Sequence, residues 1–318
     1  MAWLVTGGAG YIGSHVVREF LAADLEAVVI DDLSSGFSSF VPNGVKFIQG
    51  NLLDPGALAT ALDSEIDGVV HLAGYKYAGE SVKVPLHTYE QNVTATVKLL
   101  EAMQVAGVNK IVFSSSAAVY GTPPVDQVTE QTATSPESPY GQTKLIGEWL
   151  VAAQARATGL AHTSLRYFNV VGSGDPAVRD MSPHNLFPLV FRALAEGRTP
   201  AINGDDYPTP DGTCVRDYVH VSDIARAHVA AAKKMIAGVP LDPVYNLGAG
   251  DGTSVREIMD VAARVTGIPF TPDIRDRRPG DPARIVASGK RASADLDWTN
   301  THDLESMMST AWDAWQSL

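Results

Sequence analysis

Three side chains in the first half of the sequence could together move a proton on an alcohol oxygen. Tyr140 and Lys144 are four residues apart, so in a helix both lie on one face. A tyrosine hydroxyl has a pKa of about 10 and is a poor base at neutral pH, but a neighbouring ammonium favours the phenolate. Ser116 ends the run Ser114-Ser115-Ser116, where its hydroxyl could reach the same oxygen. Because Tyr-x-x-x-Lys pairs also occur by chance on helix surfaces, these residues indicate acid–base chemistry only together with other features.

A glycine-rich turn near the start of the sequence predicts a nucleotide site. The stretch Gly7-Gly8-Ala9-Gly10-Tyr11-Ile12-Gly13 follows an expected strand and opens an expected helix. The missing side chains let the backbone approach a pyrophosphate, and a helix N-terminus presents free N–H groups. Asp31 ends the second expected strand, where a carboxylate accepts from ribose hydroxyls and repels a 2′-phosphate. These features favour NAD over NADP, and Asp32 either joins the cofactor site or caps the loop.

The elements that must position these residues alternate between strands and helices. Apolar, β-branched runs predict strands over 3–6, 27–31, 45–49, 69–73, 110–114 and 163–167, with helices over 12–23, 58–62, 92–106 and 140–158. Near-continuous apolar strands separated by helices predict a parallel sheet covered on both faces. The fold class is therefore α/β, a Rossmann-type doubly wound parallel sheet with a smaller mixed α/β C-terminal domain for the substrate.

The second half of the sequence is richer in Pro and Gly between 172 and 213 and has helical patterns over 188–196, 221–234, 253–266 and 303–315. A further strand is expected over 244–247 and should return to the first sheet. We predict an NAD-binding domain of residues 1–169 plus about 216–247, and a substrate-binding domain of about 170–215 plus 248–318. Ligands then bind in the cleft between the two.

Composition narrows the class of protein. The 318 residues carry 24 Lys and Arg against 36 Asp and Glu, a net charge of −12, which disfavours nucleic acid and membrane surfaces as partners. The one cysteine, Cys214, cannot form an internal disulfide, and no Cys/His cluster has the spacing of a metal site. No secretory signal or membrane span is evident, so a cytoplasmic protein is expected. His71, His220, Trp298, Trp312 and Trp315 are expected to be packed side chains rather than ligands.

In combination, the motifs resemble those of the extended short-chain dehydrogenase/reductases and, within them, the UDP-glucose 4-epimerases. The first family is indicated by the glycine turn, Ser116 and Tyr140-x-x-x-Lys144. The second is indicated by Leu72-Ala73-Gly74-Tyr75-Lys76, Tyr89-x-x-Asn92, Ser114 to Gly121, Ser138-Pro139-Tyr140-Gly141, Leu165 to Asn169, Gly204 to Thr213, Val215 to Val221, Tyr245 to Gly248 and Arg277-Arg278-x-Gly280-Asp281. The resemblance covers nearly the whole chain.

The resemblance implies two binding sites. The cofactor site would contain Gly7, Gly10, Tyr11, Ile12, Gly13, Asp31, Asp32, Leu33, Ser34, Ser35, Gly36, Asn51, Leu52, Leu72, Ala73, Gly74, Lys76, Asn92, Ser114, Tyr140, Lys144, Tyr167 and Phe168. The substrate site would contain Lys76, Ser116, Tyr140, Asn169, Asn185, Leu186, Asn203, Arg216, Arg278 and Asp281. Six basic against three acidic residues between 273 and 291 suit a diphosphate, because guanidinium groups clamp its oxygens.

The activity implied is the interconversion of UDP-glucose and UDP-galactose through a transient 4-keto sugar, with tightly bound NAD as hydride carrier. Tyr140 would exchange the 4-hydroxyl proton, Ser116 would bond the same oxygen, and Lys144 would hold the nicotinamide ribose and keep the pKa of Tyr140 low. The resemblance also implies a homodimer formed through the helices at 92–106 and 140–158.

Three positions depart from the family pattern. Asn51 replaces an Asp that meets the adenine amine, and its amide oxygen is expected to accept instead. Asn203 replaces an aromatic residue that packs near uracil. Ile285 stands at the position expected to gate N-acetylated sugars, and its intermediate size leaves their acceptance open.

The same fold also carries other functions, which the sequence distinguishes to different degrees. Ala117-Ala118 stands where a 4,6-dehydratase would carry an Asp-Glu pair, which argues against water elimination. A 4-epimerase for UDP-glucuronate or UDP-N-acetylhexosamines is the alternative activity. A non-catalytic NAD sensor is the alternative of a different class, although a sensor has no need of Ser116, Tyr140 and Lys144 together.

Overall fold

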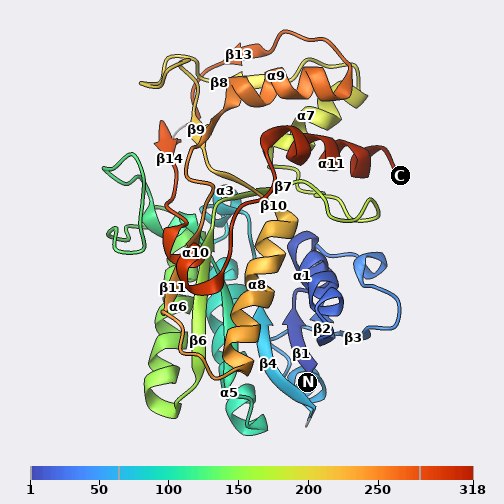
Figure 1. The fold of residues 1–318 in the computed structure, drawn as a ribbon, viewed down its shortest axis with the longest axis vertical. Coiled ribbons are helices and arrows are strands. Elements are labelled where there is room, and N and C mark those ends of the chain that lie inside the picture. The colour runs from blue at the N-terminus through green and yellow to red at the C-terminus, as the bar shows by residue number, and fades with distance from the viewer. Residues whose placement is uncertain (1, 64, 279–280, 318) are drawn as a thin grey trace.

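The core of the molecule is a seven-stranded parallel sheet. The computed structural model describes residues 2–63, 65–278 and 281–317 (Figure 1). The strands follow the order β11-β6-β5-β4-β1-β2-β3. Their bounds are β1 Ala2–Thr6, β2 Glu26–Asp31, β3 Lys46–Gln49, β4 Ile66–His71, β5 Lys110–Ser116, β6 Ala161–Tyr167 and β11 Val244–Leu247. From β1 the chain first adds β2 and β3 on one side and then crosses over to add β4, β5 and β6 on the other side. This change in the direction of strand addition, between β1 and β4, places a crevice at the carboxyl ends of those two strands.

Helices cover both faces of the sheet because successive strand residues point to opposite sides. On one face, Trp3 and Val5 pack against apolar residues of α1 (Tyr11–Ala22) and α8 (Val221–Ile236). On the other face, Ala2 and Leu4 pack toward α2 (Pro55–Ala61), α5 (Ala95–Ala106) and α6 (Pro139–Thr158). The predicted doubly wound sheet is confirmed, including the return of β11 to pair with β6.

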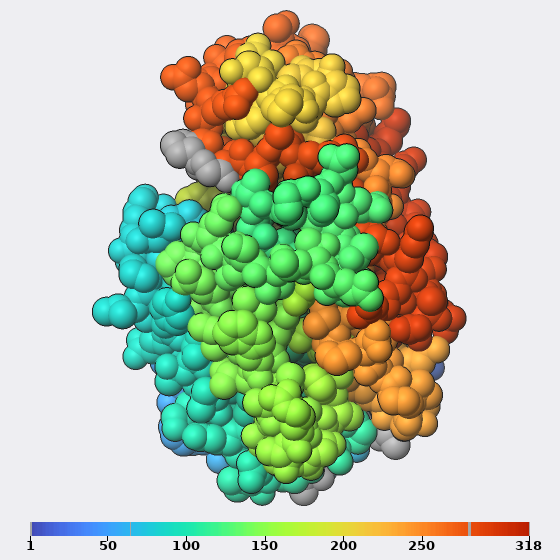
Figure 2. All heavy atoms as spheres, turned by 90° about the vertical axis from the view of Figure 1, so that its left-hand side faces the viewer, coloured from blue at the N-terminus to red at the C-terminus, as the bar shows by residue number. Residues whose placement is uncertain are grey.

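The second half of the chain builds a smaller mixed α/β layer at one end of the sheet (Figures 1 and 2). Three short sheets pair β7 with β10, β8 with β13, and β9 with both β12 and β14. Helices α7, α9 and α11 share one apolar core that includes Phe191, Ile258 and Met308. The bounds are β7 Asn169–Val171, α7 Leu186–Ala195, β8 Ala201–Asn203, β9 Val215–Arg216, β10 Tyr218–His220, β12 Thr253–Ser254, α9 Val255–Thr266, β13 Asp273–Arg275, β14 Arg284–Ile285, α10 Lys290–Leu296 and α11 Leu304–Gln316.

The helix expected over 92–106 differs at its start. A π-helical turn over Glu90–Thr94 precedes α5, and two short helices, α3 (Ala78–Ser81) and α4 (Pro85–Tyr89), lie before it. Short 3₁₀ turns lie at Ser38–Phe40 and Ala117–Tyr120. Periodicity cannot distinguish a π turn from an α turn, since both keep apolar residues on one side.

The aromatic and histidine side chains expected to pack do so. His71 is buried with Nδ1 2.8 Å from Thr6 Oγ1 and Nε2 3.0 Å from Thr96 Oγ1. His220 is buried beside Thr310, and Trp298 donates to the Asp223 carbonyl. Trp312 and Trp315 pack against Phe191, at 5.2 and 5.9 Å between ring centroids.

Neither a membrane-spanning helix nor a metal-binding cluster occurs in the described ranges. None of the helices in those ranges combines the length and apolar character needed to cross a bilayer. Within the same ranges, no three His, Cys, Asp or Glu side chains gather as a metal site would require. Gly280 of the Arg277-Arg278-x-Gly280-Asp281 motif lies outside the described residues.

Candidate active site

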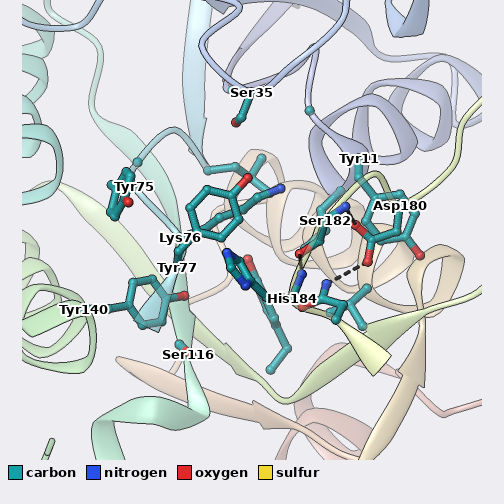
Figure 3. A pocket seen from close by; sticks show the side chains of 18 of the residues that line it. Tyr11, Ser35, Tyr75, Lys76, Tyr77, Ser116, Tyr140, Asp180, Ser182 and His184 are labelled. Atoms are coloured by element: carbon teal, nitrogen blue, oxygen red, sulfur yellow. Dashed lines mark hydrogen bonds between the residues drawn. The ribbon is translucent and has the colours of Figure 1, made fainter. Parts of the chain in front are cut away.

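One continuous cavity of about 940 Å³ joins the predicted cofactor and substrate residues (Figure 3). It opens at the carboxyl ends of the sheet strands and extends under the second-half layer. The predicted cofactor residues that line it are Gly7, Gly10, Tyr11, Ile12, Gly13, Asp31, Asp32, Ser34, Ser35, Asn51, Leu52, Leu72, Ala73, Gly74, Lys76, Tyr140, Lys144, Tyr167 and Phe168. All the predicted substrate residues line it too: Lys76, Ser116, Tyr140, Asn169, Asn185, Leu186, Asn203, Arg216, Arg278 and Asp281.

The glycine turn can adopt its tight shape only because it lacks side chains. Gly7 has a φ of +72°, and a Cβ there would lie 2.8 Å from the Ala73 nitrogen. A Cβ at Gly13 would lie 2.1 Å from the Gly7 carbonyl oxygen. Helix α1 begins after Gly10 without a side-chain cap, so its first N–H groups are left for another acceptor. This cradle fits the diphosphate of a dinucleotide.

The two acidic residues after β2 shape the loop beside this cradle. Asp31 Oδ2 accepts from the Ala9 N–H at 3.0 Å and Asp31 Oδ1 accepts from the Leu33 N–H at 2.8 Å. Burial raises the pKa of Asp31, and these two hydrogen bonds oppose that shift. Asp32 accepts from the Ser34 N–H at 2.9 Å, so the loop-capping role weighed for Asp32 is realised while its side chain also faces the cavity.

Asn51 is engaged differently from the sequence-based expectation. Its Nδ2 donates to Asp32 Oδ2 at 2.7 Å, and its Oδ1 already accepts from the Leu53 N–H at 2.8 Å. The amide oxygen expected to meet an adenine amine is therefore turned toward the backbone of its own loop. The carboxylate of Asp32 dictates this orientation, because only the amide nitrogen can donate to it.

The three proposed catalytic side chains meet in the middle of the cavity. Helix α6 is capped by Ser138, whose hydroxyl accepts from the Gly141 N–H, and this start places Tyr140 in the first turn. The Tyr140 hydroxyl faces the side chain of Ser116 (Figure 3). Lys144 is buried one turn later, with its Nζ 5.9 Å from the centre of the Tyr140 ring and donating to the Ser114 carbonyl at 2.9 Å.

The electrostatics of this group differ from the expectation that Lys144 keeps the pKa of Tyr140 low. Burial raises the pKa of Tyr140, and the hydrogen bond with Ser116 only partly offsets it. Burial also lowers the pKa of Lys144 to about 8, opposed by the charge of Glu148. Desolvation disfavours both charged forms, phenolate and ammonium, so the protein alone holds Tyr140 as a neutral phenol.

Four predicted cofactor residues lie outside the cavity lining: Leu33, Gly36, Asn92 and Ser114. Ser114 is buried with its Oγ 2.8 Å from His228 Nε2, while its carbonyl accepts from Lys144. Asn92 Oδ1 accepts from the Tyr75 N–H at 2.6 Å, and its Nδ2 donates to the Tyr75 carbonyl at 3.0 Å. Both residues thus act on groups that line the cavity and not on its interior.

The other end of the cavity is basic. Arg216 and Arg278 both approach Asp281, at 3.5 and 3.2 Å, so two guanidinium groups share one carboxylate. Arg216 also donates to the Pro282 carbonyl at 2.7 Å, which fixes its direction. The surplus positive charge suits a second diphosphate.

Several residues that line the cavity had no role predicted from the sequence, among them Tyr75, Tyr77, Asp180, His184 and Tyr218. Two tyrosines flanking Lys76 were the one signal available in the sequence. Ile285, expected to gate the sugar, lies in β14 beside Arg216 and is not among the described residues that line the cavity.

A doubly wound sheet with a glycine cradle and a Tyr-x-x-x-Lys pair in one cavity defines a dinucleotide-dependent enzyme of the short-chain dehydrogenase/reductase type. The pattern of the NAD dependent epimerase/dehydratase family matches residues 3–248. The chain belongs to this family.

Individual relatives are similar to this chain along nearly its whole length. The chain is 41% identical to a UDP-glucose 4-epimerase of Corynebacterium glutamicum, over 98% of this chain and 95% of that protein. It superposes with a TM-score of 0.93 and 39% identity on the crystal structure of UDP-glucose 4-epimerase from Brucella ovis in complex with NAD, covering 98% and 97% of the two chains. The structure of UDP-glucose 4-epimerase from Bifidobacterium longum in complex with NAD⁺ and UDP has a TM-score of 0.89 at 34% identity, covering 100% and 98%.

Proposed function

We propose that this protein is a UDP-glucose 4-epimerase that interconverts UDP-glucose and UDP-galactose through a 4-keto sugar, using resident NAD. The observation that carries the proposal is the continuity of one cavity from the glycine cradle, past Tyr140 and Ser116, to Arg216 and Arg278. A dinucleotide and a nucleotide sugar can meet in such a cavity with the hexose at the phenol.

The side chains have distinct tasks in this reaction. Tyr140 takes the proton of the sugar 4-hydroxyl and later returns it, and Ser116 donates to the same oxygen as it becomes a carbonyl. The chemistry supplied by bound NAD⁺ is the transient removal and return of a hydride at sugar C4. Its positive charge is also what the phenolate of Tyr140 needs, since burial in the protein alone raises the pKa of that group.

Inversion requires the two ends of the substrate to be held unequally. The guanidinium groups of Arg216 and Arg278 and the amide of Asn185 would bind the diphosphate and uridine. The 4-keto sugar must turn its opposite face to the nicotinamide while the nucleotide stays bound, so its own contacts have to be weak. The distribution of arginines at only one end of the cavity supports this division.

The direct test is incubation of purified protein with UDP-galactose and no added cofactor. Formation of UDP-glucose is expected, because the hydride returns to the same substrate. Stoichiometric consumption of added NAD would instead indicate a dehydrogenase. Binding of NAD without any turnover of UDP-galactose, UDP-glucuronate or UDP-N-acetylhexosamines would indicate a sensor.

The role of Tyr140 is tested by Tyr140→Phe, which keeps the ring and removes the proton-transferring oxygen. We expect kcat to fall at least about 100-fold, the usual contribution of a positioned acid–base group. Tyr89→Phe is the matched control: its hydroxyl donates to Gln142 Oε1 at 2.5 Å near the same helix but outside the described cavity lining. Retention of more than about a tenth of wild-type kcat by Tyr140→Phe would contradict the assignment.

We infer further that the protein forms a homodimer through α5 and α6. Figure 2 views this side of the molecule, with the green residues of α6 in the middle. Trp149 on α6 is 60% exposed, and Leu86 on α4 and Val105 on α5 are 83% and 91% exposed. Large apolar side chains gathered on neighbouring helices support association.

Trp149→Glu is expected to shift the protein toward monomer in sedimentation velocity, because a carboxylate in an apolar interface loses its hydration. Val239→Glu, at a side chain that is 43% exposed elsewhere, should leave the dimer intact. Wild-type protein that sediments as a monomer at micromolar concentration would end this inference.

We also infer a cytoplasmic location, consistent with a buried single thiol at Cys214 and with the need for NAD and nucleotide sugars. Cell fractionation of the native protein tests this. Galactose use and the supply of glycan precursors both require the proposed reaction.

A further inference from the structure

A row of aromatic rings crosses the middle of the cavity. His87, Tyr75, Tyr77 and His184 follow one another, with centroid distances of 5.1, 5.5 and 5.2 Å and near-perpendicular ring planes. All four residues line the cavity. The first three come from the segment between β4 and α5, whereas His184 comes from the second-half layer just before α7. The Tyr77–His184 pair therefore joins opposite walls of the cleft.

Hydrogen bonds to Asn92 fix the backbone of the loop that carries Tyr77. The side chain of Asn92 makes two hydrogen bonds with the backbone of Tyr75, and Nδ2 of the same amide donates to Thr143 Oγ1 at 2.8 Å. On the other wall, the His184 N–H donates to Ser182 Oγ at 3.2 Å, and the neighbouring Asn185 donates to Asp180 at 2.7 Å. Both rings thus project from anchored backbone, as a fixed wall requires.

The position of the pair indicates which part of a substrate it would face. Tyr77 is adjacent to Lys76 and His184 is adjacent to Asn185, and both of these neighbours belong to the proposed substrate site. In Figure 3 the pair lies between Tyr140 and Ser116 on one side and Asp180 and Ser182 on the other. A hexose whose C4 is at Tyr140 and whose diphosphate is at the arginine end has its ring and its C2 and C6 substituents in this region.

We infer that Tyr77 and His184 form the wall that limits the size of the sugar, an inference that rests on the proposed epimerase function. Ring faces confine a hexose by shape and by contact with its C–H groups, without directional hydrogen bonds that would favour one C4 configuration over the other. Such a wall selects by size while leaving the keto sugar free to turn. Ile285, outside the described lining, is not part of it.

The test compares UDP-N-acetylgalactosamine with UDP-galactose as substrates of wild type, Tyr77→Ala, Tyr77→Phe, His184→Ala and Ile285→Ala. The quantity compared is kcat/KM for UDP-N-acetylgalactosamine divided by kcat/KM for UDP-galactose. We expect Tyr77→Ala and His184→Ala each to raise this ratio at least about tenfold, because a pocket discriminates by about that factor against a group larger than one methylene. Tyr77→Phe keeps the ring and should keep the wild-type ratio. Ile285→Ala should change the ratio by less than about twofold.

A binding measurement makes the test independent of turnover. Calorimetry with UDP and with UDP-N-acetylgalactosamine should show the N-acetylated sugar gaining affinity in Tyr77→Ala and His184→Ala, with the Kd of UDP itself unchanged. The inference would be wrong if both variants kept the wild-type ratio of kcat/KM for the two sugars, or if Ile285→Ala changed that ratio as much as they do. Wild type that binds these ligands but never converts UDP-galactose would refute the proposed activity. The affinity comparison would then still show whether Tyr77 and His184 limit the size of the bound sugar.

Discussion

At the scale of single residues, burial decides the chemistry of the site more than proximity does. Lys144 lies one helical turn from Tyr140, yet its Nζ is 5.9 Å from the ring centre and bonds the Ser114 carbonyl. Both groups have lost solvent, so each resists carrying its charge. In the proposed reaction, Tyr140 therefore stays a neutral phenol until a positively charged nicotinamide ring is bound.

The pKa of Lys144, lowered to about 8 by burial, predicts a pH dependence of activity. Below that value the side chain is an ammonium, which donates stronger hydrogen bonds to the nicotinamide ribose that Lys144 is proposed to hold; above it the charge is lost. We expect kcat/KM to decline as pH rises through about 8 to 9. Lys144→Arg should be less active but lack this decline, because a guanidinium remains charged. A wild-type profile that stays level to pH 9.5 would contradict the role of this charge.

At the scale of elements, two helices support the site through contacts made behind it. In α6, Tyr140, Lys144 and Glu148 follow at four-residue intervals, and Glu148 is fixed by Arg166 at 2.6 Å in a buried ion pair. The π-helical turn before α5 places Asn92 where it holds both the Tyr75 backbone and Thr143. Such turns often occur at functional sites, and here the turn connects α5 to the loop of the aromatic wall.

Asn92→Ala is expected to destabilise the protein by about 1 kcal/mol, because it removes a buried amide and leaves the half-buried Tyr75 N–H without its acceptor. Urea unfolding followed by circular dichroism measures this change. Asn109→Ala is the matched control at an exposed position and should stay within about 0.5 kcal/mol of wild type. Equal stability of the two variants would show that the amide does not hold the loop.

At the scale of the whole molecule, a buried histidine links the start of α8, which covers the sheet, to α11 of the second-half layer. His220 precedes α8, lies with its Nε2 3.0 Å from Thr310 Oγ1 in α11, and stacks on His302 at 3.8 Å. Burial and the adjacent His302 lower the pKa of His220 to about 3. The junction is therefore built from neutral imidazole.

This junction predicts a loss of stability in acid. An unfolded histidine titrates near pH 6.5 and the folded one near 3, so between these values the unfolded state binds the extra proton. Stability is fully present above about pH 6.5 and falls below it, by at most about 1.4 kcal/mol per pH unit for one such group. His220→Gln should show a shallower fall between pH 7 and 5 in denaturant titrations. His87→Gln, at an exposed ring, should keep the wild-type slope, and identical slopes for all three proteins would refute the argument.

The local features of this protein could be predicted from sequence because they depend on neighbours along the chain. The glycine turn, the Tyr140–Lys144 spacing and the alternation of strands and helices follow from backbone sterics and from periodicities of 2 and 3.6 residues. Arg278 was predicted from the basic stretch between 273 and 291, whereas Arg216 followed from the family resemblance. These features predict the parallel sheet, which the structure confirms, and the sheet edge at which its ligands are expected to bind.

Features that depend on what packs around a residue emerged only in three dimensions. The raised pKa of Tyr140 comes from burial by several elements, and the orientation of Asn51 comes from Asp32 in the loop after β2. Contact between Tyr77 and His184 requires the second-half layer to close over the sheet, and no local pattern encodes that approach. Desolvation and long-range contacts are sums over distant segments, which is why tertiary structure decided the electrostatics and the shape of the sugar site.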